Sequence, residues 1–142
     1  MDLVFKDIVL KKIFVENIVV RFNKKYKKDF DKNSDDIKFI WKIGKVNKQS
    51  NIFILEIDVN INKSKINFEK RAYKFEAKII GIFEINDFEK NKDAYVNAAL
   101  SIMVGAVRSY LSTVTKDFPA NEYILPSIDL KQLLKCYASK KR

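Results

Sequence analysis

The chain has 142 residues, with 28 lysines and arginines against 18 aspartates and glutamates, and therefore a formal net charge of +10. This length predicts a single domain over residues 1–142 with one hydrophobic core, and residues 139–142 as a frayed tail. A hydrophobic content of 47% excludes a disordered chain, and no apolar stretch is long enough to predict a membrane span. The first residues do not have the pattern of a signal peptide, so we expect a soluble, cytoplasmic protein.

The residue types needed for common catalytic and metal sites are scarce. The sequence contains one cysteine and no histidine, which removes the commonest metal ligand and the commonest general base. No paired carboxylates, nucleophile–base pair or glycine-rich phosphate loop stands out. We therefore expect a protein that is not an enzyme and uses neither metal nor cofactor.

Four strands are predicted in the first 85 residues. β-branched and aromatic residues predict the first strand over 5–22, with a bend or bulge near Lys11 and Lys12. Apolar and polar residues then alternate over 37–43, 53–61 and 73–85, with polar turns at 46–51 and 62–65. Successive strands joined by short turns favour an antiparallel meander with one buried face.

A long helix is predicted after the strands, from Ala94 to about Thr115, with Asp93 placed to cap it. One face carries an apolar stripe, and another carries a stripe of small residues that permit close approach of a second backbone. This stripe predicts either tight packing on the sheet or a contact between subunits, which we favour. Its candidate interface residues are Ala98, Ser101, Gly105, Ser109 and Ser112.

The remaining segment is predicted to be an extended crossover followed by a short helix. Pro119 and Pro126 keep the preceding residues out of helical angles. Asp129 then caps a helix from Leu130 to about Ser139. Strands followed by helices predict an α+β fold.

The strand YKFEAKIIGIF at 73–83, the helix ending near Thr115, Phe118-Pro119 and the segment LPSIDL at 125–130 occur in a characteristic order. In this order the chain resembles the SecB protein-export chaperones. The resemblance extends in element order from Phe5 to Tyr137. It implies a four-stranded antiparallel sheet with two helices, assembled as a homotetramer from two dimers, with the long helices at the interface.

The resemblance also implies an apolar groove between the sheet, the crossover and the second helix. In the family, unfolded or pre-secretory polypeptides bind in this groove without ATP or metal, which makes the protein a holdase used in protein export. The groove residues expected here are Phe39, Trp41, Phe118, Tyr123, Ile124, Leu125, Pro126, Leu130, Leu133 and Tyr137. Ordinary core packing is the alternative for each of them.

The chain departs from the family on the outer sheet face. Acidic residues there dock the family on the preprotein translocase motor ATPase, but the aligned positions here hold Asn17 and Arg21, and an apolar contact is replaced by Lys74. Glu76 alone matches, so it is the one candidate docking residue. The acidic tail of the family is also replaced by a basic one, Lys140-Lys141-Arg142.

Three functions remain open from the sequence. The first is a general holdase, and the second is a SecB-like chaperone dedicated to one client, such as the antitoxin of a toxin–antitoxin pair. The third is a basic module that binds single-stranded nucleic acid and stacks bases on exposed aromatic residues such as Trp41 and Tyr73. Only four of the 28 basic residues are arginines, and the lysines are scattered, which favours solvated faces over a nucleic-acid site.

Overall fold

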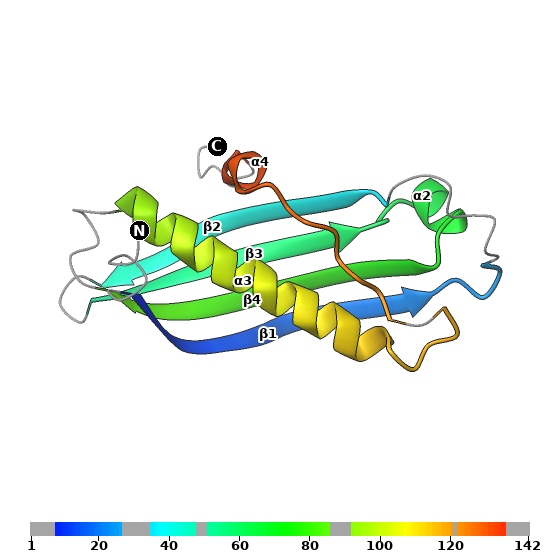
Figure 1. Ribbon diagram of the computed structural model, residues 1–142, viewed down its shortest axis with the longest axis horizontal. Helices are drawn as coiled ribbons and strands as arrows, with labels where there is room; N and C mark the ends of the chain where they lie inside the picture. Colours follow the sequence, from blue (N-terminus) through cyan, green and yellow to red (C-terminus); the bar gives the residue numbers. More distant parts are fainter. Residues whose placement is uncertain (1–7, 27–34, 48–50, 86–91, 121, 136–142) are drawn as a thin grey trace.

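The computed structural model contains one twisted sheet with helices on one face (Figure 1). It describes residues 8–26, 35–47, 51–85, 92–120 and 122–135. Along the chain the elements are β1 (Ile8–Phe22), β2 (Ile37–Asn47), β3 (Ile52–Ile61), α2 (Lys65–Glu69), β4 (Tyr73–Ile85), α3 (Lys92–Thr115) and α4 (Leu130–Leu134). This arrangement confirms the α+β fold predicted from the sequence.

The four strands are antiparallel and lie in the order β1-β4-β3-β2. The part from β2 to β4 is the predicted meander, whereas β1 lies beside β4 and not beside β2. Strands β1 and β4 have similar lengths and pair along their whole length, with Ile8 opposite Ile85 and Phe22 opposite Tyr73. The register shifts between Leu10 and Lys12, where a bulge was predicted, and again between Val15 and Asn17.

Strict alternation explains the faces of the two central strands. Every second side chain of β3 and β4 points into the core, and Phe53, Leu55 and Phe75 are fully buried. Polar residues such as Glu56 and Lys78 occupy the other face, where their side chains form an ion pair of 3.3 Å. Burying apolar side chains on one face stabilises the sheet by roughly 1.5–3 kcal/mol for each large residue.

Helix α3 lies diagonally across the inner face of the sheet (Figure 1). Its approach is close at Gly81 of β4, because a Cβ atom there would lie 2.5 Å from the Sδ atom of Met103. The helix begins at Lys92, two residues before the predicted start, so Asp93 lies in its first turn and not at the cap. By length and mean hydropathy (1.2) α3 also passes as a membrane span, but its buried residues Leu100 and Met103 pack on the sheet as core.

Two local predictions are wrong. The segment 62–65 is not a simple turn, because it leads into α2, whose first turn is capped by Ser64: the Oγ atom of Ser64 accepts a hydrogen bond of 3.1 Å from the backbone N–H of Asn67. Helix α4 ends at Leu134, with Lys135 as its cap, and not near Ser139. Residues 136–142, which include Tyr137 and the predicted tail, lie outside the described residues.

Candidate peptide-binding cavity

The crossover, residues 116–129, runs from the end of α3 back to the edge of the sheet (Figure 1). Leu125 anchors it, because its side chain is 2% exposed while Ile124 is 63% exposed. Arg108 of α3 adds two hydrogen bonds of 3.3 Å, from Nε to the carbonyl oxygen of Leu125 and from Nη2 to that of Pro126. The crossover is therefore held against α3 and the sheet at its midpoint.

Helix α4 is fixed to the edge strand β2. Its start is capped as predicted, since Asp129 Oδ1 accepts a hydrogen bond of 3.0 Å from the backbone N–H of Lys131. The indole Nε1 of Trp41 donates a hydrogen bond of 2.7 Å to the carbonyl oxygen of Leu133. Trp41 and Leu133 are both buried, at 6% and 2% exposure, so this contact joins α4 to the core.

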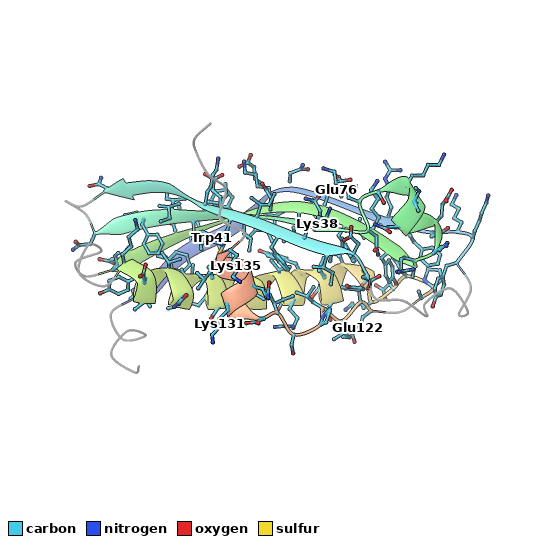
Figure 2. All side chains as sticks on the ribbon, turned by 90° about the horizontal axis from the view of Figure 1, so that it is seen from above. Lys38, Trp41, Glu76, Glu122, Lys131 and Lys135 are labelled. Carbon is cyan, nitrogen blue, oxygen red and sulfur yellow. The ribbon has the colours of Figure 1, made fainter. Side chains whose placement is uncertain are left out.

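Beside this contact an open cavity of about 560 Å³ lies between β2, the start of α3 and the end of α4. Its volume is in the range of ligand pockets, which is about 300–1,000 Å³. Figure 2 shows Trp41 on the sheet side of α4, which carries Lys131 and Lys135. Apolar side chains dominate the lining, with two charged residues among them: Trp41, Ile43, Lys92, Asp93, Val96, Asn97 and Leu134.

Asn97 is the unusual residue in this wall. Its Oδ1 atom is buried, and no hydrogen-bond donor among the described residues reaches it. A buried polar atom without a partner costs about 1–3 kcal/mol. Because this oxygen is closed to solvent, the surface that the cavity presents to a ligand is mainly apolar.

The structure places the predicted groove residues in two separate locations. Phe39 and Trp41 lie on the inner face of β2, and Trp41 meets Leu133 of α4. Phe118 and Tyr123 instead join an aromatic cluster around Tyr73, with ring centroids 5.8 Å and 6.2 Å from its ring. The crossover residues between these locations are the buried Leu125 and the exposed Ile124 and Pro126. The side chain of Leu130 and the whole of Tyr137 lie outside the described parts of the chain.

Six lining residues were not among the predicted groove residues: Ile43, Lys92, Asp93, Val96, Asn97 and Leu134. Ile43 continues the alternation that includes Trp41, and Leu134 lies one position after Leu133, so the sequence held a signal for both. Val96 and Asn97 carried no such signal, because their role depends on α3 starting next to β2. That proximity is a tertiary contact between distant segments.

The aromatic cluster borders a second, smaller cavity of about 160 Å³ that includes Asp35 and Tyr123 in its lining. Burial, and after it the negative charge of Asp35, raises the pKa of the Tyr123 hydroxyl well above its ordinary value. Burial also raises the pKa of Tyr73. The Nε atom of Arg71 lies 3.6 Å from Asp35 Oδ1, so this location is a packed polar corner of the core.

The aromatic residues proposed as nucleic-acid stacking platforms are not exposed. Trp41 is 6% exposed and Tyr73 is 4% exposed, and both face the helical layer. The prediction of exposed aromatic platforms is therefore wrong at both positions. Base stacking requires accessible ring faces, which these two residues do not offer.

The small-residue stripe of α3 is largely open. Ser101 and Ser109 are exposed, and a Cβ atom at Gly105 would meet nothing within 4 Å. Ala98 is buried at 3% exposure, and the Ser112 hydroxyl donates a hydrogen bond to the Glu122 carboxylate. The outer face of the helix is thus accessible from residue 101 to residue 109.

Glu76 lies on the sheet face opposite the helices (Figure 2). Its carboxylate is 3.7 Å from the Nζ atom of Lys74 on the same strand. Arg21 is the cross-strand neighbour of Lys74, and Asn17 is the neighbour of Lys78. The neighbours of Glu76 on β1 and β4 are thus basic or neutral, whereas on β3 the carboxylate of Asp58 lies opposite Lys78.

Comparison with known proteins is informative at the level of structure. No family model matches the sequence, and a search of curated proteins finds no relative. The structure is similar to a SecB-like chaperone of Mycobacterium tuberculosis in complex with a ChAD peptide from the HigA1 antitoxin, with a TM-score of 0.67, 11% identity, and 88% of this chain and 93% of that chain covered. A protein of unknown function from Streptococcus agalactiae has a TM-score of 0.50, 8% identity, and 86% and 98% coverage. The chain therefore has the SecB-like fold.

Proposed function

We propose that the protein is an ATP-independent holdase, a cytoplasmic chaperone that binds unfolded or extended polypeptides at the cavity beside Trp41. The observation that carries this proposal is an open, mainly apolar cavity beside the buried contact between Trp41 and Leu133. An apolar lining accepts many different side chains, which suits a ligand of varied sequence. The SecB-like neighbour bound to a peptide supports the same type of ligand.

One cavity of this size binds weakly. Burying one large apolar side chain contributes roughly 1.5–3 kcal/mol, and ordering a flexible client segment offsets part of it. Several linked sites on one assembly raise the effective concentration and hold a long client. We therefore include in the proposal a homotetramer built as a dimer of dimers through the open face of α3 around Gly105.

Other apolar surface supports assembly. Leu10 and Ile18 of β1 are each 37% exposed, although their register with Phe83 and Ala77 places them on the helix-covered face. Size-exclusion chromatography with light scattering measures the mass directly. A tetramer is expected, and a Gly105→Leu variant that still forms the tetramer would contradict the proposed contact.

A chaperone dedicated to one client is an equally compatible form of this proposal. The observation that favours it is the neighbour's ligand, which is a peptide from an antitoxin. A pull-down from the native host separates the two forms. One dominant small partner would support the dedicated role, many unrelated preproteins would support a general role in export, and recovery of the translocase ATPase would support docking through Glu76.

The proposed activity is tested by the aggregation of a reduced, unfolded client, followed by light scattering. We expect stoichiometric protein to suppress aggregation and Leu134→Lys, which places a charge in the cavity lining, to reduce suppression. Val114→Lys is the matched control, because Val114 is 38% exposed and lies near the other end of α3. Equal suppression by the two variants, or no suppression by the unaltered protein, would overturn the proposal.

A further inference from the structure

The charges around the cavity are unevenly distributed. Lys92 and Asp93 are in its lining, and Lys131 and Lys135 are exposed on α4 (Figure 2). The nearest carboxylate on that helix belongs to Asp129, which is at the far end from Leu134 and accepts the capping hydrogen bond from Lys131. The exposed charges on α4, the helix that supplies Leu134 to the cavity, are therefore basic.

The lysines of α4 differ from those on the outer sheet face. On that face Lys42 and Lys78 pair with Glu56, at 3.9 Å and 3.3 Å. No carboxylate of the described residues forms an ion pair with Lys131 or Lys135. After Asp129 the sequence contains no further acidic residue and five basic ones: Lys131, Lys135, Lys140, Lys141 and Arg142. The charge of the α4 segment is not compensated within its own sequence.

We propose that the cavity selects polypeptide segments in which an apolar anchor residue is flanked by acidic residues. The anchor fills the space between Trp41, Val96 and Leu134, and the flanking carboxylates lie near Lys131 and Lys135. Complementary charge at the rim of a site increases the association rate and discriminates among ligands more than it adds affinity. This inference rests on the proposed function and specifies its substrate class.

The expected difference in affinity between acidic and basic peptides follows from the strength of exposed ion pairs. Each exposed pair of opposite charges is weak and is screened by salt, so the preference is greatest at low ionic strength. Replacing acidic flanks with basic ones exchanges attraction for repulsion at both lysines. Several such exposed interactions together correspond to about a tenfold difference in affinity.

The test uses two fluorescein-labelled peptides with the same apolar anchor, one flanked by glutamates and one by lysines, with binding followed by anisotropy. The glutamate peptide is expected to bind about tenfold tighter at low salt, and the difference is expected to disappear at about 1 M salt, where the Debye length is about 3 Å. The double variant K131E/K135E is expected to reverse the preference. Lys131 and Lys135 are both exposed, so these two substitutions do not disturb the hydrophobic core.

The matched control is K24E/K25E, which makes the same change in net charge at two exposed lysines after β1, at the opposite end of the sheet from the start of α3 (Figure 1). It should leave the preference nearly unchanged. Equal binding of the two peptides, or equal effects of the two double variants, would overturn the inference while leaving the holdase proposal intact. Failure of both peptides to bind, together with no protection of an unfolded client, would overturn the proposed function itself.

Discussion

The Trp41 indole N–H bonds to the carbonyl oxygen of Leu133, which lies 92 residues later in the chain, at 2.7 Å. This bond joins the edge strand β2 to the last helix, and both partners are buried. Trp41 is also the chain's only tryptophan and lines the cavity. One side chain thus fixes a wall of the proposed site and reports on it by fluorescence.

Trp41→Phe keeps an aromatic ring on β2 but removes the N–H donor. The Leu133 carbonyl then loses a buried partner, and we expect the free energy of unfolding to fall by about 1–3 kcal/mol. Urea denaturation followed by circular dichroism measures this change. Amide hydrogen exchange should also become faster in α4, and unchanged exchange there would show that the bond does not hold the helix.

Replacing Gly81 and Gly105 with alanine should change the stability of the protein in opposite directions. A Cβ atom at Gly81 would lie 2.5 Å from Met103 Sδ and 2.9 Å from a Phe83 ring carbon, so Gly81→Ala should cost about 1–3 kcal/mol of stability through overpacking. At Gly105 a Cβ atom meets nothing within 4 Å, and Gly105→Ala should add up to about 1 kcal/mol through helix propensity.

The two alanine variants control for each other in a denaturant titration. The expectation for Gly105 applies to the folded subunit, measured at concentrations where the assembly state of the two proteins is the same. A stability gain at Gly81 would show that α3 does not contact β4 as closely as described.

Asn97→Leu should separate stability from binding. The buried Oδ1 atom has no hydrogen-bond partner among the described residues, so its replacement should raise the free energy of unfolding without ligand by about 1–3 kcal/mol. The same change alters the shape of the cavity lining, of which Asn97 is part, and peptide affinity should fall. Asn97→Ala is the control for side-chain volume, and a leucine variant that gains both stability and affinity would contradict the role of Asn97.

Alkaline pH should destabilise the protein through its buried tyrosines. The pKa values of Tyr73 and Tyr123 are raised above the 10.0 of an exposed tyrosine. Above about pH 10 the unfolded chain therefore loses protons that the folded chain keeps, and stability falls as pH rises, by at most about 1.4 kcal/mol per pH unit for each group. Stability should vary little through these two groups from about pH 7 to pH 9.

Tyr123→Phe should make this alkaline fall shallower, because one of the two groups no longer titrates. Unfolding by urea at a series of pH values measures the slope. The double replacement of Tyr73 and Tyr123 should flatten it further. A slope that neither variant changes would place the alkaline sensitivity elsewhere in the chain.

Sequence patterns predicted the helices and strands themselves better than they predicted which of these elements lie side by side. The alternation in β3 and β4 is strict because one face is buried against α3 and the other is in water, so both strands could be identified residue by residue. The position of β1 beside β4 could not be, because no local pattern records which distant strand it pairs with. Helix α2 was missed since it has only five residues, too few for a helical stripe to be distinguished from a polar turn.

The site was predictable where it depends on one element. Trp41 and Leu133 could be named because each stands out on its own strand or helix. Tyr123 was placed with them although it packs 5.1 Å from the Phe75 ring, in another part of the core. Asn97 was not predictable, since a polar residue near a helix start is ordinary until a neighbouring strand buries it.

The two hydrogen bonds from Arg108 to the carbonyl oxygens of Leu125 and Pro126 fix the segment that leads to α4 against the middle of α3. Hydrogen bonds to a charged group are worth about 1.5–3 kcal/mol each when well formed, and moving this segment away from α3 breaks both. The position of α4, which supplies Leu134 to the cavity lining, therefore depends on a residue in the middle of α3 that is not itself part of that lining.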